Sequence, residues 1–278
     1  MKLLSDIYFP ITASPFDNND DYCEIMASEA LRPYIRCFWG TRYPRRSDTV
    51  SETHGIVIPD TCMDIIFTVN YTGNQCNACF CTIDEHSYDT RSIVNDDLCA
   101  TFAIRFYAWS AILFSEQDMT GQKNSVFSAD EFYREISKEL SPLLFDIPDI
   151  KGKIAVAEKI LMRRLNRKLI DPNLLNGIYY MITTSGRAKI SDVCGYTAVS
   201  EKTLQRLFNY NMGVSPKTFS SLIRYQLLWQ DIILSNKFNV FDAVEKFGYT
   251  DQPHLLNDFK RRHLMTPSDA IKYAVKGK

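Results

Sequence analysis

Two stretches in the last third of the chain carry polar side chains at the spacing of a single helix face. The residues are Lys202, Gln205 and Arg206 in the first stretch, and Gln252, His254, Asn257 and Lys260 in the second. Arg, Lys, Gln and Asn can hydrogen-bond the base edges in the major groove, where each base pair presents a distinct pattern of donors and acceptors. Lys and Arg also neutralise phosphates. The two stretches therefore predict a pair of helices that bind double-stranded DNA.

Three cysteines lie close together in the N-terminal half, at Cys76, Cys79 and Cys81, with His86 nearby. Three soft ligands within six residues could bind zinc or copper, or could form a redox switch. A strand, however, places Cys79 and Cys81 on the same face, which also suits two small buried hydrophobic side chains. A regulator that senses metal or redox state through these cysteines is therefore the alternative function.

The remaining candidates for chemistry are sparse, and no catalytic residue is predicted. A metal-dependent cupin enzyme needs two or three histidines and a carboxylate, whereas only His54 and His86 lie in this half, without a His-x-His spacing. We therefore predict no metal site, no cofactor and no enzymatic activity, and a cupin-type small-molecule enzyme is the weakest alternative. Asp60 is predicted to lie in a turn. Arg105 is predicted to form a salt bridge with Asp60 or Asp64.

Each polar helix belongs to a unit that occurs twice. A short apolar helix ends at a glycine, Gly195 or Gly248, where a left-handed residue is easiest to accommodate. The second helix then begins at a polar cap, Ser200 or Asp251. Pro253 falls in the first turn of its helix, where a missing N–H does no harm. A continuous amphipathic helix is predicted over residues 219–229 and would fix the spacing of the two units.

The N-terminal half has a different pattern. Runs rich in β-branched and aromatic residues at 55–59, 63–69 and 101–106 are separated by turn-forming clusters, which predicts a small β-sandwich or barrel. Helical spacing follows from about residue 128. Asp171-Pro172 then interrupts the helical pattern, because the residue before proline is disfavoured in the α region. We place the domain boundary there, with a sensing or dimerising domain at 1–170 and a DNA-binding domain at 171–278.

Charge supports this division. Of the 32 Lys and Arg residues 14 lie in residues 172–278, against only 8 of the 33 Asp and Glu residues, although the whole chain has a net charge of −1. A basic domain joined to an acidic one suits a protein that attracts a polyanion with one end. No transmembrane helix or signal peptide is predicted, and the eight cysteines suit reduced thiols in the cytoplasm.

Residues 172–278 resemble the DNA-binding domain of the AraC/XylS family of transcriptional regulators. The matching segments are Ser200-x-x-x-Leu204-Gln205-Arg206-Leu207-Phe208, Gly213-x-Ser215-Pro216, Ile223-Arg224, Phe247-Gly248-Tyr249, Phe259-Lys260-Arg261-Arg262 and Thr266-Pro267. The resemblance implies that Lys202, Gln205 and Arg206 read one half of a DNA site. It implies that Gln252, His254 and Asn257 read the other half. Ser200, Arg224, Lys260 and Arg261 would mostly contact phosphates, and Thr203 completes the predicted DNA-binding set.

The second unit departs from the family pattern at three positions. An arginine is common where Asn257 stands, an apolar residue where Asp258 stands, and a glycine where Leu264 stands. We expect Asp258 to place a negative charge near DNA. We also expect Leu264, in place of glycine, to disfavour the left-handed backbone conformation that commonly ends a helix. The first unit is therefore expected to contribute more DNA affinity than the second.

The N-terminal half resembles, more weakly, the cupin-like domain found ahead of this module. The segments that carry the resemblance are Leu31-x-Pro33-Tyr34-Ile35-Arg36-x-Phe38-Trp39, residues 57–67 and residues 103–109. The predicted fold class is α+β: a β-rich cupin-like barrel with flanking helices, followed by an all-α domain with two helix-turn-helix units joined by a long helix. The resemblance implies an unknown small-molecule effector. RNA polymerase and a second copy of the chain are further partners considered, with residues 154–165 as a dimer contact or as packing within the domain.

Overall fold

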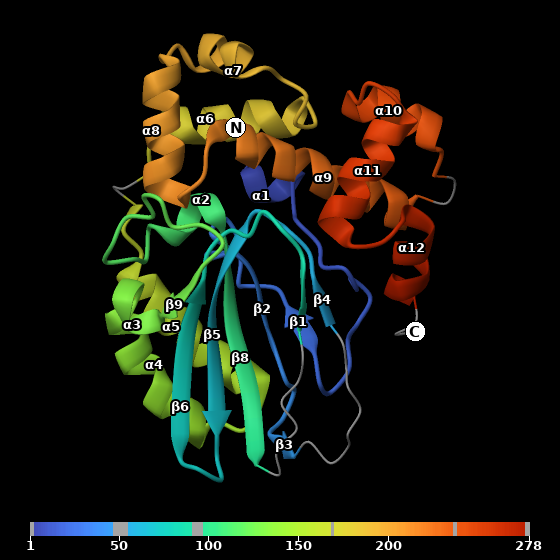
Figure 1. The fold of residues 1–278 in the computed structure, drawn as a ribbon. Helices are drawn as coiled ribbons and strands as arrows, with labels where there is room; N and C mark the ends of the chain where they lie inside the picture. Colours follow the sequence, from blue (N-terminus) through green and yellow to red (C-terminus); the bar gives the residue numbers. More distant parts are fainter. Residues whose placement is uncertain (1–2, 47–54, 91–96, 168–169, 236–237, 276–278) are drawn as a thin grey trace.

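The computed structural model describes residues 3–46, 55–90, 97–167, 170–235 and 238–275. The N-terminal part is built on a seven-stranded antiparallel sheet in the order β1-β2-β8-β5-β6-β9, with β3 paired to β8, and β4 pairs with β7 in a second sheet (Figure 1). The strands are β1 Cys23–Ile25, β2 Ile35–Gly40, β3 Arg45–Arg46, β4 Gly55–Val57, β5 Cys62–Asn70, β6 Gln75–Cys81, β7 Tyr88–Thr90, β8 Leu98–Tyr107 and β9 Val126–Ser128. The predicted β-rich N-terminal domain is confirmed.

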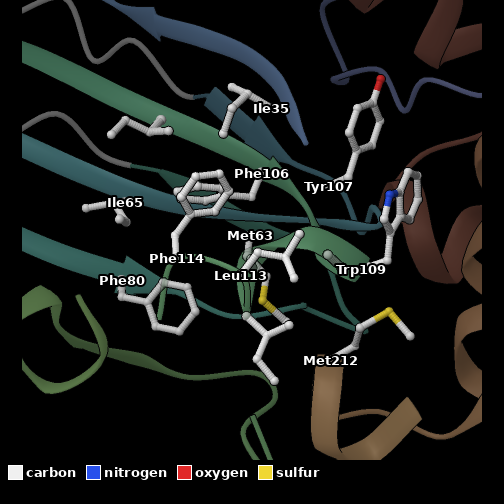
Figure 2. Packing of buried hydrophobic residues seen from close by; sticks show 14 of the residues in the cluster. Ile35, Met63, Ile65, Phe80, Phe106, Tyr107, Trp109, Leu113, Phe114 and Met212 are labelled. Atoms are coloured by element: carbon white, nitrogen blue, oxygen red, sulfur yellow. The ribbon is translucent and has the colours of Figure 1, made fainter. Parts of the chain in front are cut away.

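The two faces of the large sheet carry different side chains because neighbours along a strand point to opposite faces. Met63 and Ile65 of β5 are paired with Phe106 and Ile104 of β8, and all four are fully buried on the face that the helices cover. Figure 2 shows this apolar packing. The alternate residues, among them Asp64 and its partner Arg105, lie on the other face. That second face is where the sheet can hold polar groups.

Short helices cover the apolar face and lead into the C-terminal part. They are α1 Leu4–Ile7, α2 Ala108–Ala111, α3 Ala129–Phe132, α4 Arg134–Asp146 and α5 Ile150–Arg164. The helix expected at 154–165 lies within α5, which packs against α4 and buries Ile154, Ala157, Ile160 and Leu161. Its alternative role as a dimer contact stays a prediction.

In the ranges that the structure describes, the secondary structure of the C-terminal part is all-α, as predicted. It consists of α6 Pro172–Thr183, α7 Ile190–Thr197, α8 Glu201–Met212, α9 Pro216–Leu234, α10 Val240–Phe247, α11 Gln252–His263 and α12 Pro267–Val275. Helix α9 runs between the α7/α8 pair and the α10/α11 pair (Figure 1), so the connecting helix expected at 219–229 is confirmed and longer. Among the described residues no helix has both the length and the apolar content that a membrane span requires.

The hydrophobic core continues across the predicted domain boundary, which itself stays a prediction. One cluster of buried residues joins the sheet to α6, α7, α8 and the first half of α9. Met212 at the end of α8 lies near Trp109 and Leu113 of the N-terminal part (Figure 2). A second cluster joins α9–α12 to Ile11, Ala13 and Ile58. The helical units are therefore packed against the sheet domain and are not merely tethered to it.

The caps of the paired helices follow the sequence, with one correction. Ser200 and Asp251 accept hydrogen bonds from the N–H groups of Thr203 and His254, and Gly248 ends α10 in the left-handed region at φ 66°. The prediction for Gly195 was wrong, because α7 continues to Thr197 and its left-handed cap is Ala198 at φ 55°. A last helical turn that keeps its hydrogen bonds outweighs the conformational preference of one glycine.

This correction predicts two stabilising substitutions. Gly195 is exposed within α7 with no atom near its missing β-carbon, so Gly195→Ala should stabilise the protein by about 0.5–1 kcal/mol through lower backbone entropy in the unfolded chain. Ala198→Gly should stabilise it by about 1 kcal/mol, because an L side chain is disfavoured at a positive φ. Urea unfolding measures both. If α7 ended at Gly195, Gly195→Ala would instead be destabilising.

Candidate nucleic-acid interface

Helix α8 has one buried face and one exposed face. Leu204 and Phe208 are fully buried, whereas Lys202, Gln205 and Arg206 are exposed. At the start of the helix, the Ser200 hydroxyl accepts the N–H of Thr203 at 3.1 Å. Ser200 is therefore occupied as a cap, and the three long polar side chains form the outward face that the sequence predicted.

The other end of α8 is held by the N-terminal part. Met119 donates its N–H to the Tyr210 carbonyl at 2.9 Å, and Gly121 donates its N–H to Asn209 Oδ1 at 3.2 Å. Gly213 ends the helix at φ 70°, and a β-carbon there would overlap the Gln122 carbonyl. The orientation of α8 is thus fixed by a loop of the sheet domain as well as by its own unit.

Helix α11 presents the second polar face. His254, Asn257, Lys260 and Arg261 are exposed, and Leu255 and Phe259 are fully buried beneath them. Gln252 differs from the prediction, because it is half-buried and its Nε2 is enclosed without a hydrogen-bond partner. The structure therefore places three of the four polar residues predicted for this face on the exposed surface of α11.

Asp258 is buried and does not lie on the exposed polar face of α11, contrary to the expectation from the sequence. Only 6% of Asp258 is exposed. Its carboxylate accepts the Tyr249 hydroxyl at 2.9 Å and forms ion pairs with Arg261 and, at 3.4 Å, with Arg262. Burial opposes ionisation, but the Arg262 guanidinium together with the Tyr249 and Arg261 contacts holds the pKa of this carboxyl below its usual range. Asp258 therefore ties α11 to the turn before it.

Leu264 also behaves differently from the prediction. Despite the missing glycine, α11 still stops in the left-handed region, with Leu264 at φ 62°. The half-exposed leucine side chain accepts a conformation that L residues rarely adopt. The second unit therefore keeps the helix stop of the family pattern, at a cost in backbone strain.

Arg224 lies between the two units. Its guanidinium stacks over the Tyr249 ring, 4.6 Å from the centroid, and its buried Nε has no partner. It lines a groove of about 390 Å³ together with Arg187, Lys189 and Lys217, all three of which are exposed. Sequence reasoning missed these three basic residues, because they lie in loops and at the start of α9, outside the two polar helices.

A cavity of about 370 Å³ opens on the polar face of the sheet. Its wall includes Asp64 and Arg105, which form the predicted salt bridge at 3.0 Å. It also includes Tyr273 of α12, whose hydroxyl accepts the Ile56 N–H at 3.2 Å. The cavity is therefore bounded by the sheet on one side and by α12 on another.

The three neighbouring cysteines do not converge. Cys76 lies on the face of β6 toward Ser141 and Lys153, and Cys79 and Cys81 lie on the opposite face with Asp64. A hydrogen bond between the Cys79 and Cys81 thiols lowers the pKa of Cys79 to about 7. All eight cysteines carry free thiols. The redox alternative is thereby narrowed to Cys79 and Cys81.

A metal centre finds no support among the described residues. Within the ranges that the structure describes, no group of three or more His, Cys, Asp or Glu side chains could hold a metal ion. His86 is exposed, and His54 lies outside the described residues. The metal-sensing alternative through all three cysteines loses its geometric basis, because Cys76 faces away from the other two.

Two families of known domains match the sequence. Residues 193–272 match the family described as "Helix-turn-helix domain", and residues 23–128 match a "Domain of unknown function (DUF6597)". No curated protein sequence matches this chain. The first match covers α8 and α11 with the helices that precede them.

Several solved structures resemble the chain at low identity. An AraC-type regulator from Chromobacterium violaceum is 20% identical over 38% of this chain and 94% of its own, with a TM-score of 0.35. A probable AraC family regulator from Rhodopseudomonas palustris is 19% identical over 37% of this chain and 98% of its own, with a TM-score of 0.33. ToxT from Vibrio cholerae O395 is 11% identical over 86% and 98% of the two chains, with a TM-score of 0.43.

Proposed function

We propose that this chain is a DNA-binding transcriptional regulator of the AraC type, that its helix-turn-helix domain at residues 193–272 binds double-stranded DNA, and that a small molecule in the N-terminal cavity controls this binding. The observation that carries the DNA-binding part is the pair of exposed polar faces on α8 and α11. Both faces belong to helices that are capped, packed on an apolar side and connected by α9.

We assign base contacts and phosphate contacts to different residues. Lys202, Gln205 and Arg206 on α8, and Gln252, His254 and Asn257 on α11, are proposed to reach base edges in the major groove. Phosphate contacts are assigned to the remaining basic and capping residues at the rim: Ser200, Thr203, Arg224, Lys260 and Arg261, together with Arg187, Lys189 and Lys217 of the groove around Arg224.

The N-terminal segment supports control by a ligand, because it contacts both the cavity and α9. Thr12 lines the cavity, and its carbonyl accepts the indole N–H of Trp229 at 2.9 Å. The neighbouring Ile11 donates its N–H to Gln226, whose own amide donates to the Pro59 carbonyl at 2.8 Å. A ligand that repositions this segment therefore acts directly on the helix that sets the spacing of the two units.

A second connection runs through residues 84–88. Asp84 and Tyr88 line the cavity, whereas Glu85 accepts the Thr218 hydroxyl at 3.2 Å and Ser87 donates to the Arg262 carbonyl. One short segment thus contacts the cavity, the start of α9 and the end of α11. A ligand shifts DNA affinity only if it binds the two arrangements of these elements with different affinity.

The same proposal covers the wider role of the protein. We assign it a cytoplasmic location and no catalytic activity. RNA polymerase and a second copy of the chain are its proposed protein partners, with the exposed surface of α5 as the candidate dimer contact.

The DNA-binding proposal predicts unequal contributions from the two units. On a fragment selected from genomic DNA by the purified protein, Arg206→Ala should raise the Kd about 10- to 100-fold, the loss expected for one good base contact. Asn257→Ala should raise it less, because asparagine adds no charge and the first unit keeps its full set of basic residues. Fluorescence anisotropy at several salt concentrations measures both variants.

The matched control is Lys138→Ala, which removes an exposed charge from α4, outside the proposed DNA and dimer contacts. It should leave the Kd and its salt dependence unchanged. Equal losses from Arg206→Ala and Asn257→Ala would overturn the unequal roles of the units, and no loss from either would overturn the interface itself.

A further inference from the structure

The shape and the walls of the N-terminal cavity indicate the size and type of molecule it can hold. A volume of about 370 Å³ lies within the range of small-molecule sites. Four aromatic side chains line it, from four separate segments of the chain: Tyr22, Trp39, Tyr88 and Tyr273. Ile56, Ile58 and Ile66 form an apolar part of the lining. The cavity therefore suits a compact organic molecule with an apolar portion.

The charge of the lining is strongly one-sided. Asp17, Asp60, Asp64 and Asp84 all line the cavity, and Arg105 is the single basic residue among the described residues that do. Aromatic faces are also electron-rich and attract cations. Both features favour a positively charged occupant.

Arg105 is not available to hold an anion. Its guanidinium is paired with Asp64 at 3.0 Å and lies 3.9 Å from Glu24. It also stacks over the Trp39 ring, 5.7 Å from the centroid, and the Trp39 indole donates to Asp64 at 2.6 Å. The charge of Arg105 is thus already neutralised by carboxylates.

The negative charges of Asp60 and Asp84 have few partners that stabilise them. Asp60 accepts the Cys62 N–H at 2.7 Å, and Asp84 forms no hydrogen bond or ion pair with any part of the chain that the structure describes. Burial raises the pKa of Asp60 to about 6, although Arg105 opposes the rise. Burial and the nearby charges of Asp60 and Asp64 raise the pKa of Asp84 to about 6. At neutral pH both are therefore ionised at a cost to the folded state, which a bound cation would offset.

We propose that this cavity binds a small organic cation, an amine with an apolar portion, whose charge is held by Asp60 and Asp84 and whose body lies among the aromatic walls. The inference rests on the proposed function, because it names the chemical class of the effector. It places the charge of the ligand beside residues 84–88, the segment that contacts the start of α9 and the end of α11.

Three probes of similar size and different charge test the class of ligand. Calorimetric titration of the full chain at pH 7.5 compares 2-phenylethylamine, neutral 2-phenylethanol and anionic 3-phenylpropionate. The amine should bind at least about tenfold more tightly than the alcohol, because only the amine gains from the carboxylates and the aromatic faces. The anion should bind no better than the alcohol. Tighter binding of the anion, or no binding of the amine at millimolar concentration, would overturn the proposal.

Isosteric variants separate recognition from structural support. Asp60→Asn and Asp84→Asn should each weaken binding of 2-phenylethylamine about tenfold and, without ligand, raise the Tm by a few degrees, because each removes a carboxylate that is costly to ionise. In Asp60→Asn the new amide oxygen can still accept the Cys62 N–H. Asp130→Asn, an exposed position on α3, should change neither quantity. Unchanged amine affinity in the two cavity variants would contradict the assignment.

The DNA readout distinguishes this inference from the proposed function. If 2-phenylethylamine binds in a manner that needs Asp60 and Asp84 but leaves the DNA Kd unchanged, the cation site stands and control of DNA binding fails. If 3-phenylpropionate binds and shifts the DNA Kd, control stands and the cation site fails.

Discussion

Replacing Asp258 with alanine is expected to weaken DNA binding and to destabilise the second helix-turn-helix unit by about 3–5 kcal/mol, the usual cost of removing one partner from a buried ion pair. The carboxylate holds Tyr249, Arg261 and Arg262 together, and the Arg262 side chain is itself only 11% exposed. Without Asp258 the Arg262 charge stays buried beside the Tyr225 ring, and among the described residues Ser221 is the side chain left to accept a hydrogen bond from it. Helix α11 would then lose its fixed position relative to α10.

Two measurements decide the role of Asp258. Urea unfolding gives the loss of stability, and anisotropy on the selected DNA fragment gives the change in affinity. A charge that faced DNA, as its position in the sequence suggested, would make Asp258→Ala bind more tightly with little change in stability. Asp242→Asn, which neutralises an exposed acid at the start of α10, is the control for a general effect of charge.

The interactions of Asp258 could be predicted from the sequence only in part. Caps such as Ser200 and Asp251 could be predicted because they depend on residues three positions apart. The Asp258–Arg262 pair has the i,i+4 spacing that stabilises helices, so half of its role could have been found in the sequence. Its burial could not, since burial depends on how α9 and α10 pack over α11.

The cysteines and the cavity also differ in how far the sequence predicts them. Cys76 and Cys79 are three residues apart in a strand, so the alternation of side chains already places them on opposite faces. The cavity has no comparable local pattern. Its walls come from the N-terminal segment, β2, β4–β8 and α12, and only the fold brings Asp60, Asp84 and Tyr273 together. Sequence reasoning found Asp60, Asp64 and Arg105 individually but could not show that they share one cavity.

His263 is expected to make the second unit sensitive to acid. Its side chain is fully buried between the Trp229 and Phe259 rings, and its Nδ1 pairs with the Tyr225 hydroxyl at 2.8 Å. Burial lowers the pKa of His263 to about 3. The folded state therefore resists protonation below the ordinary histidine pKa, so its full stability is present above pH 6.5 and is lost as the pH falls toward 3. By pH 5 the loss should be about 2 kcal/mol.

His263→Phe isolates this effect, because a phenyl ring fills a similar volume and cannot be protonated. Tyr225 keeps a partner in the Arg262 carbonyl at 3.3 Å. Between pH 7.5 and 5 the variant should lose about 2 kcal/mol less stability than the native protein. The His254→Gln control, at an exposed position on α11, should retain the native dependence.

The native protein must be compared with His263→Phe because protonation of other groups also changes the stability of the protein at low pH. Asp60 and Asp84 have raised pKa values, so their protonation stabilises the sheet domain as the pH falls below about 6. Asp258 has a lowered pKa, so its protonation at lower pH has the opposite effect and destabilises the folded protein. Acid should therefore release the α11 unit before it unfolds the sheet, and hydrogen exchange at pH 5 should be faster in α11 than in β5 and β8. Parallel pH profiles for the native protein and His263→Phe would contradict the assignment to His263.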